Sequence, residues 1–353
     1  MGQFAGSGGA YLFCVLSGEA MLTTDSIIPL VAHTLEARAD LFDPRHETAL
    51  RLFNGFSEGC PDLVIDLYAR TLVMHNYADE PDSAPALLQQ AQAYLLAKLP
   101  WLTASVVKTR NAKDAAERNG VIVHGDKVDR RIREHGVWYA LELFLNRDAS
   151  FYLDTRNVRQ WAITHLRTKS VLNTFAYTGS LGVAAQAGRA SRVVHLDRNR
   201  EFLNVAKTSY TLNGFPIIKA DFQTGDFFTQ VSRLKRTGER FECVFVDPPF
   251  FSTTSKGTVN LVTESHRIVN KVRPLIADGG YLVTINNALF VSGAEYIKTL
   301  EELCADGYLS IEELIPVPPD FTGYPQTIQR TPPVDPAPFN HSTKIAVLRV
   351  RHK

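Results

Sequence analysis

Residues 241–251 read Phe-Glu-Cys-Val-Phe-Val-Asp-Pro-Pro-Phe-Phe, an apolar run that ends abruptly in an Asp-Pro-Pro-aromatic turn. A run of β-branched and aromatic residues bounded in this way predicts a buried strand of a parallel sheet. The strand must stop at Pro248, because proline has no backbone N–H with which to continue a central strand. Ligands of α/β folds bind at the carboxyl ends of the strands, so this turn marks a candidate site.

The chain around this stretch alternates between strand and helix patterns. From about residue 156, short apolar segments separated by segments of helical spacing lie at 170–175, 192–197, 216–221, 243–247 and 281–286. This alternation predicts a parallel, doubly wound sheet with helices on both faces. Segments 309–315 and 344–350 follow without a long helix between them. We expect them to form an antiparallel edge that completes a Rossmann-like α/β sheet of seven strands.

The residues before position 150 have a different character. Short extended segments at 49–53, 62–67 and 71–75 are joined by turns and followed by an amphipathic helix at 82–99, which predicts a small α+β domain. We therefore divide the chain into an extension at 1–28, a small domain at 29–150 that is a candidate for substrate or RNA binding, and an α/β domain at 151–353. The proline-rich segment 316–338 is expected to be a long active-site or surface loop.

Composition excludes several classes of protein. Lys plus Arg number 38 and Asp plus Glu number 37, so any binding to nucleic acid must use a local patch. Candidate patches lie at 127–133 and 233–240, although either run also fits a solvated loop. The four cysteines are scattered and indicate neither a disulfide framework nor a metal site, which fits a reducing cytoplasm. The apolar stretch 10–16 is too short to span a bilayer, so no membrane partner is predicted.

A glycine and three aspartates lie at or just after the carboxyl ends of the predicted parallel strands. Gly179, in the turn after the first strand, can adopt backbone conformations closed to other residues, and the helix start beyond it offers free amides. Asp197 ends the second strand, near the position where nucleotide-binding α/β folds place a carboxylate for ribose hydroxyls. Asp221 ends the third predicted strand and Asp247 the fourth. These groups are therefore expected to share one rim of the sheet.

The glycine turn argues against a dinucleotide cofactor. A pyrophosphate needs a G-x-G-x-x-G turn, and only Gly179 and Gly182 are present here. Several carboxylates and few basic groups suit S-adenosylmethionine, which carries a ribose, an adenine and a cationic sulfonium.

Five motifs in order resemble those of class I S-adenosylmethionine-dependent methyltransferases; they lie at 152–156, 172–179, 194–197, 212–214 and 245–250. More closely, they resemble the branch that modifies bases of bacterial 23S ribosomal RNA. The resemblance covers about residues 48–350, and the 48 residues before it are too few for the N-terminal PUA domain that many of these relatives carry. It implies a cytoplasmic enzyme that acts on large-subunit rRNA. It does not indicate whether the protein is a monomer or a homodimer.

The resemblance also implies which residues bind the cofactor. Tyr177, Thr178 and Gly179 would surround its methionine part, Asp197 its ribose and Asp221 its adenine. Asp154 and Arg156 would lie over the pocket, unless they form only a local ion pair. The full implied set is Asp154, Arg156, Phe175, Tyr177, Thr178, Gly179, Asp197, Asp221 and Asp247.

The Asp-Pro-Pro-Phe turn is the implied catalytic segment. Pro248 and Pro249 fix the backbone, so that the Asp247 side chain and nearby carbonyl groups become rigid acceptors. Phe250 would stack on a flipped-out base, a contact worth roughly 1–3 kcal/mol. The alternative is a proline-stiffened turn with Phe250 packed in the core.

The residues near two strand ends bear on the atom that is methylated. Methylation at C5 of a pyrimidine requires a cysteine thiolate, but Cys243 lies within a predicted strand, and residues 284–288 read Thr-Ile-Asn-Asn-Ala. Asn286 and Asn287 instead resemble the branch that methylates guanine N7. We therefore favour direct displacement by a ring or exocyclic nitrogen, without a metal or a covalent enzyme intermediate.

Two alternatives stay open: a cytosine-C5 enzyme with a displaced nucleophile, and a non-catalytic module that binds cofactor or RNA. The predicted substrate-binding residues are Phe251, Lys256, Asn286 and Asn287. His341 is a further candidate at the border of the pocket.

Overall fold

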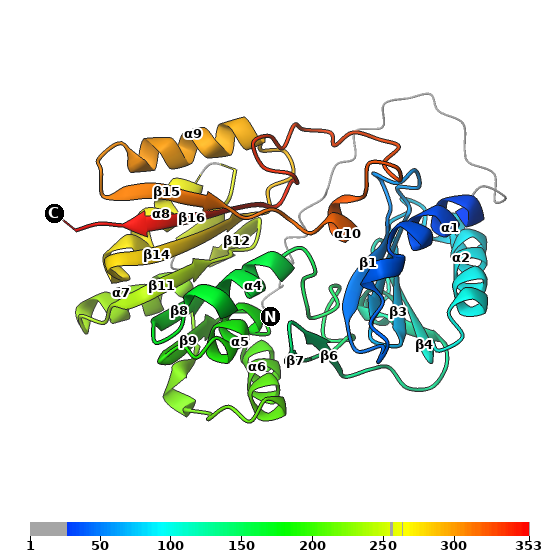
Figure 1. Cartoon of the computed structure of the whole chain (residues 1–353), viewed down its shortest axis with the longest axis horizontal. Coiled ribbons are helices and arrows are strands. Elements are labelled where there is room, and N and C mark those ends of the chain that lie inside the picture. Colours follow the sequence, from blue (N-terminus) through cyan, green and yellow to red (C-terminus); the bar gives the residue numbers. More distant parts are fainter. Residues whose placement is uncertain (1–26, 255–256, 263, 353) are drawn as a thin grey trace, which may run out of the picture.

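The computed structural model describes residues 27–254, 257–262 and 264–352. It contains two large sheets, one in each half of the chain, with an orange segment that includes α10 between them (Figure 1). None of the helices in these ranges combines the length and the apolar character needed to cross a bilayer. The predicted extension lies outside the described residues except for its last two positions, which begin helix α1.

The first half of the chain forms a five-stranded sheet in the order β1-β2-β3-β4-β5. Its strands are β1 (Ala49–Asn54), β2 (Leu63–Tyr68), β3 (Thr71–Asn76), β4 (Ala104–Thr109) and β5 (Val121–His124). The helical elements around them are α1 (Ile27–Ala37), η2 (Ala39–Leu41), η3 (Pro81–Ser83), α2 (Pro85–Lys98) and α3 (Ala115–Asn119). Only β3 and β4 pair in parallel; the other neighbours are antiparallel.

The two faces of this sheet have different partners because successive residues of a strand point to opposite faces. Leu50, Ile65 and Met74 pack with residues of α1 and α2 in one apolar cluster. Residues at the alternate positions, such as Tyr68 and Val73, belong to a second cluster shared with the other half of the chain. We call this second side the inner face. The hairpin of β6 (Arg131–Glu134) and β7 (Val137–Ala140) then leads into the larger sheet.

The second half forms the predicted seven-stranded sheet, in the order β10-β9-β8-β11-β14-β16-β15. Its strands are β8 (Ser170–Thr174), β9 (Arg192–Asp197), β10 (Phe222–Thr224), β11 (Phe241–Val246), β14 (Ile276–Asn286), β15 (Leu309–Leu314) and β16 (Lys344–Val350). The first five strands in that order are parallel, and β16 runs antiparallel to both β14 and β15. The expected doubly wound sheet with an antiparallel edge is confirmed.

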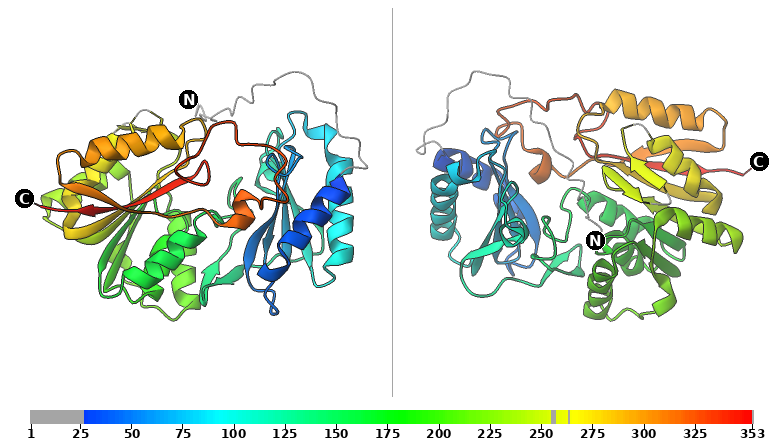
Figure 2. Two further views of the ribbon diagram at one scale, coloured as in Figure 1. Left: turned by 45° about the horizontal axis from the view of Figure 1, so that its top comes forward. Right: turned by 180° about the vertical axis from the view of Figure 1, so that it is seen from behind.

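Helices cover both faces of this sheet (Figures 1 and 2). One face packs against α4 (Arg156–His165), α5 (Ser180–Ala187) and α6 (Arg200–Leu212). The other packs against α7 (Phe227–Arg236), α8 (Ser265–Val272) and α9 (Gly293–Cys304). Shorter elements are η4 (Lys219–Asp221), β12 (Phe251–Thr254), β13 (Gly257–Asn260), η5 (Arg273–Leu275) and α10 (Pro319–Thr322).

The strand predicted at 216–221 is wrong. Its apolar residues Ile217 and Ile218 are 41% and 57% exposed, so they join no buried sheet. The strand β10 begins only at Phe222, and Asp221 precedes it. Asp221 therefore lies at the amino end of β10, where its carboxylate pairs with Arg192, the first residue of β9, at 2.8 Å.

The segment predicted as a loop at 316–338 reaches back to the first sheet, and we call it the strap. Its short helix α10 packs against β1, as Figures 1 and 2 also show. Asp320 of the strap is 1% exposed, and its backbone carbonyl accepts a hydrogen bond from the buried Arg38 of the small domain at 2.8 Å. The strap thus connects the two sheets.

Candidate active site

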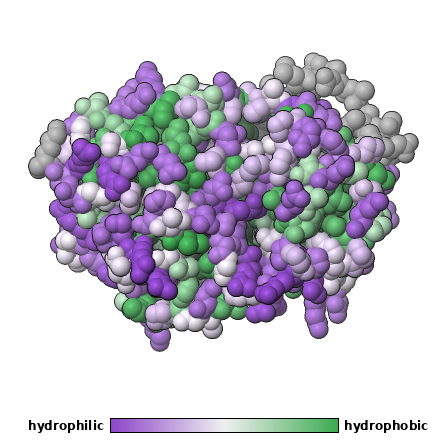
Figure 3. All heavy atoms as spheres, viewed as in Figure 1, coloured by the Kyte–Doolittle hydropathy of each residue, from purple (hydrophilic) through white to green (hydrophobic). Residues whose placement is uncertain are grey.

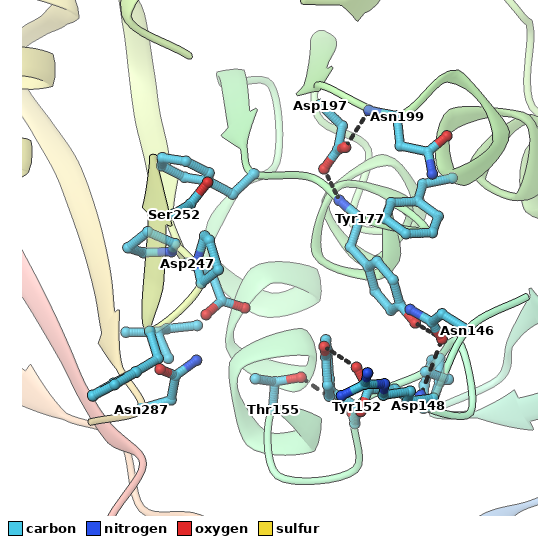
Figure 4. Close-up of a pocket in the computed structure, with 18 of the residues that line it drawn as sticks. Asn146, Asp148, Tyr152, Thr155, Tyr177, Asp197, Asn199, Asp247, Ser252 and Asn287 are labelled. Carbon is cyan, nitrogen blue, oxygen red and sulfur yellow. Dashed lines mark hydrogen bonds between the residues drawn. The ribbon is translucent and has the colours of Figure 1, made fainter. Parts of the chain in front are cut away.

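A cavity of about 920 Å³ lies between the two halves of the chain, which is within the usual range for ligand pockets. The ends of β8, β9, β10 and β11 form one side of it, and the inner face of the small sheet forms the other. Hydrophilic side chains gather along the boundary between the halves on the face shown in Figure 3. Figure 4 shows residues from separate segments converging on this space.

The turn between β8 and α5 is wound through left-handed conformations. Phe175, Tyr177 and Gly179 have φ angles of 52°, 51° and 79°. Such angles are uncommon for residues with side chains and concentrate at functional sites. Phe175 and Tyr177 both line the cavity.

Asp197 joins the ends of two strands. Its Oδ2 accepts a hydrogen bond from the backbone N–H of Tyr177, and its Oδ1 accepts one from the N–H of Asn199, each at 2.8 Å. Burial raises the pKa of this carboxyl group, although the backbone hydrogen bonds oppose the change. Asp197 lines the cavity beside these contacts (Figure 4).

Aromatic side chains form the neighbouring part of the wall. The Tyr177 hydroxyl donates to Asn146 Oδ1 at 3.1 Å, and its ring lies 5.1 Å from that of Tyr152 and 4.6 Å from that of Phe202. The Tyr152 hydroxyl in turn donates to Asp148 Oδ2 at 3.0 Å. These contacts fix flat apolar surfaces next to carboxylates, an arrangement suited to a ligand with an aromatic ring and cationic groups.

Thr178 and Gly179 lie behind the wall, and neither is among the residues that line the cavity. The Thr178 hydroxyl donates to the carbonyl of Ser150 at 2.6 Å. A Cβ at Gly179 would lie 2.5 Å from that of Ala206 on α6. In the structure both residues support the turn, and their contact with the cofactor stays a prediction.

The Asp-Pro-Pro-Phe corner lies on the cavity wall. Asp247, Pro248, Pro249, Phe250 and Phe251 all line the cavity, and the hairpin of β12 and β13 follows directly. Burial raises the pKa of Asp247 to about 8, and the charge of Asp154 adds to this effect.

Asp154 lines the same cavity and is itself incompletely paired. Its Oδ2 accepts a hydrogen bond from the Thr343 hydroxyl at 2.9 Å, and burial raises its pKa. Its Oδ1 is buried and has no hydrogen-bond partner among the described residues. A buried acceptor of this kind calls for a donor from a ligand or from water.

The cavity fits S-adenosylmethionine by the chemistry of its wall. Asp154, Asp197, Asp226 and Asp247 offer acceptors, whereas the ligand offers ribose hydroxyls, an adenine amino group and two cationic groups. Asp226, at the carboxyl end of β10, takes the place on the rim that the sequence analysis gave to Asp221. Its signal in the sequence is its position as the N-cap of α7, where its side chain accepts from the N–H of Thr229.

Arg156 is also misplaced by the sequence prediction. It does not line the large cavity; its guanidinium donates to Asp320 at 2.6 and 3.0 Å, to Glu134 at 3.3 Å, and to the carbonyl of Ala49 at 2.8 Å. It therefore ties α4 to the small domain and the strap. Asp221 is likewise absent from the cavity wall.

The predicted substrate-binding residues separate into two groups. Phe251 and Asn287 line the cavity, whereas Asn286 is buried behind it and accepts from the N–H of Ala288 at 2.9 Å. Lys256 lies outside the described residues. His341 is not on the wall; its ring packs edge-on against Phe321.

The positions of the cysteines bear on covalent catalysis. Among the described residues, Cys60, Cys243 and Cys304 do not line the cavity. Cys243 is fully buried within β11, and burial raises the pKa of its thiol, which disfavours the reactive thiolate.

Comparisons with known proteins identify the family of the chain. Residues 52–327 match the family model of S-adenosylmethionine-dependent methyltransferases. The chain is 30% identical over 294 residues to ribosomal RNA large subunit methyltransferase I of Aeromonas salmonicida, covering 82% of this chain and 73% of that protein. The chain is also 28% identical over 268 residues to ribosomal RNA large subunit methyltransferase I of Aliivibrio fischeri, covering 75% of this chain and 67% of that protein.

Solved structures show the same fold. A putative methyltransferase, SMU.776, complexed with SAH superposes with a TM-score of 0.79 at 20% identity, covering 94% of this chain and 83% of that one. A tRNA m1G37 methyltransferase of M. jannaschii gives a TM-score of 0.51 at 12% identity, covering 96% and 82%. The chain therefore belongs to the family of S-adenosylmethionine-dependent methyltransferases, and S-adenosylmethionine is its methyl donor.

Proposed function

We propose that this methyltransferase modifies a base of large-subunit ribosomal RNA at a nitrogen atom, with guanine N7 favoured. The observation that carries the proposal is the acid-lined cavity at the Asp-Pro-Pro-Phe corner, whose wall includes none of the described cysteines. The relatives named as ribosomal RNA large subunit methyltransferases support RNA as the substrate. An rRNA substrate would place the protein in the bacterial cytoplasm.

Each wall residue has a role that follows from its chemistry. When bound, S-adenosylmethionine supplies an electrophilic methyl group on a cationic sulfur. Asp197 and Asp226 are suited to accept hydrogen bonds from the ribose and adenine. The cationic cofactor favours the ionised forms of Asp154 and Asp247, and their negative charge then stabilises the positive charge that passes to the base. Guanine N7 carries no proton, so these residues need not act as a general base.

The corner itself contributes alignment. Pro248 and Pro249 restrict the backbone, so the Asp247 side chain starts from a fixed position. Phe250 and Phe251 give apolar ring surfaces on which a flipped-out base can stack. The same rings exclude water from the acceptor atom. Alignment and electrostatics then account for catalysis without a covalent enzyme intermediate.

The test is methyl transfer from tritiated S-adenosylmethionine to large-subunit rRNA from cells that lack the protein, followed by mass spectrometry of the nucleosides. We expect 7-methylguanosine. Phe250→Ala should reduce transfer without changing cofactor affinity, whereas Cys243→Ser should retain the specific activity of the folded protein. The Cys243→Ser variant is the matched control, because it alters a buried side chain away from the cavity.

Two results would contradict the proposal in different ways. A 5-methylcytidine product, or a covalent adduct trapped with 5-fluorocytidine RNA, would establish the cytosine-C5 alternative. Cofactor binding without methyl transfer to any RNA would favour the non-catalytic module.

A further inference from the structure

The two sides of the cavity differ in charge. Residues from position 146 onward contribute one wall with five carboxylates, Asp148, Asp154, Asp197, Asp226 and Asp247, against two arginines, Arg147 and Arg198. The inner face of the five-stranded sheet contributes the other wall, with Arg51, Asp66, Tyr68, His75, Tyr77 and Arg110. We call the second the basic wall. A cationic cofactor matches the first wall, so the basic wall is left for a ligand of opposite character.

Strand geometry places these side chains together. Arg51 of β1 lies directly opposite Asp66 of β2 in the antiparallel register. His75 and Tyr77 alternate along β3 and its extension, and Arg110 follows β4, with its N–H donating to the carbonyl of Asn76 at 3.0 Å. Because alternate residues share a face, the wall is a consequence of the sheet and not of a mobile loop.

The Arg51 guanidinium is held in one orientation. Its Nε and Nη2 donate to Asp66 at 2.8 and 3.2 Å, and its Nη1 donates to Asn54 at 3.3 Å. Its central carbon lies 3.8 Å from the centre of the Phe321 ring, which belongs to the strap. These bonds use three of the five N–H groups of an arginine, and the described residues give no acceptor for the other two. Arg51 therefore presents a prearranged pair of donors at the cavity.

Tyr77 and Arg110 extend this surface. The Arg110 guanidinium lies 5.6 Å from the centre of the Tyr77 ring, and both residues are half-buried on the wall. Tyrosine rings stack on unpaired bases, and arginines bind phosphate or base oxygens. The combination of one ring and two guanidinium groups is the chemistry of a nucleotide subsite.

We propose that the basic wall binds the substrate nucleotide opposite the cofactor, with Tyr77 stacking on a base and Arg51 and Arg110 binding its oxygen acceptors. This inference rests on the proposed RNA substrate and adds the residues that select it. The oxygens belong either to a backbone phosphate or to a base carbonyl. The two sources differ in their dependence on salt, because only a phosphate contact releases counterions.

The variants are Arg110→Gln, Tyr77→Leu and Arg51→Lys, with Tyr77→Phe as the control that keeps the ring. Lys298→Gln removes one charge from the exposed surface of α9, where the lysine side chain is 76% exposed, and controls for net charge. The probes are labelled, unmodified transcripts of 23S rRNA domains for anisotropy, and S-adenosylmethionine for calorimetry. Melting temperatures confirm that each variant is folded.

We expect Arg110→Gln and Tyr77→Leu to raise the Kd for RNA roughly tenfold or more. The Kd for S-adenosylmethionine should change less than about twofold, and Tyr77→Phe and Lys298→Gln should resemble the wild type. A phosphate contact of Arg110 predicts that the slope of log affinity against log salt falls by about 1 in Arg110→Gln. An unchanged slope with weaker binding assigns Arg110 to a base carbonyl. Arg51→Lys keeps the positive charge but loses the paired N–H donors of the guanidinium. It should therefore raise KM for RNA without altering the slope of log affinity against log salt.

Unchanged RNA affinity in both Arg110→Gln and Tyr77→Leu, alongside an active wild type, would overturn this inference and leave the proposed function intact. A wild type that neither binds nor methylates RNA would overturn both. Because Arg51 pairs with the buried Asp66 and its substitution can reduce stability, the decision rests on the other two variants.

Discussion

Replacing Asp247 by asparagine is expected to stabilise the ligand-free protein while it impairs methyl transfer. Burial raises the pKa of this carboxyl group from its ordinary value of 3.8 to about 8, with a further contribution from the charge of Asp154. Between these two pH values the folded protein retains a proton that the unfolded chain has released. The wild type therefore loses stability as the pH rises through this window.

The size of the effect follows from the shift in pKa. Each pH unit in the window costs about 1.4 kcal/mol, so a shift from 3.8 to about 8 corresponds to roughly 6 kcal/mol at its upper limit. Asp247 borders an open cavity, and water relieves part of this cost. We expect the free energy of unfolding of Asp247→Asn to exceed that of the wild type by about 2–3 kcal/mol at pH 7, which corresponds to a rise in Tm of roughly 4–8 °C.

Thermal unfolding of both proteins without cofactor at pH 5, 6, 7 and 8 measures this difference. The advantage of Asp247→Asn should widen with each step in pH. Glu301→Gln, which removes a charge from the exposed surface of α9, provides the baseline for a simple change in net charge. Saturating S-adenosylmethionine should narrow or reverse the difference, because a cationic ligand favours the ionised carboxylate of the wild type.

The reasoning would be refuted if Asp247→Asn melted below the wild type at all four pH values. It would also be refuted by a stabilisation of the same size at every pH. Either result would mean that the wall of the cavity does not disfavour the charged form of Asp247.

Three further predictions concern the frame of the site. Gly179→Ala should reduce the free energy of unfolding by about 1–3 kcal/mol, measured by chemical denaturation, because φ is 79° and the new Cβ would lie 2.5 Å from that of Ala206. Asp320→Asn removes the carboxylate that Arg156 contacts at 2.6 Å, so it should cost about 3–5 kcal/mol in thermal unfolding and speed proteolysis of the strap. The wild type should trap no adduct with 5-fluorocytidine RNA, and loss of methyl transfer in Cys243→Ser with cofactor binding intact would contradict the direct mechanism.

Hydrophobic periodicity was sufficient to predict most of the large sheet. Strands such as β8, β9 and β11 are buried on both faces, so their residues form continuous apolar runs that end in turns. The prediction failed where an apolar run does not correspond to a buried strand. Ile217 and Ile218 are β-branched but exposed, whereas the strand beside them has only three residues. Because the strand was predicted at 216–221 and β10 is Phe222–Thr224, the prediction placed Asp221 at the carboxyl end of the strand and overlooked Asp226.

Contacts between the domains could not be predicted from local patterns. Arg156 and Asp320 are separated by 164 positions in the sequence, and nothing near either residue indicates its partner. Arg51, Asp66 and His75 occupy alternate positions of strands, a pattern that equally fits a solvated face. Only the packing of the two domains shows that this face encloses a cavity.

The strap connects the two walls on which the proposed reaction depends. Asp320 accepts hydrogen bonds from the Arg156 side chain at the start of α4 and from the backbone N–H of Arg51 at 3.1 Å. The next residue, Phe321, supports the Arg51 guanidinium. One short helix therefore sets the separation between the acidic wall and the basic wall. A misplacement of about 1 Å between reacting groups can reduce the rate about 100-fold. Substitutions at Asp320, which is outside the cavity wall, should therefore lower kcat even in molecules that remain folded and bind the cofactor.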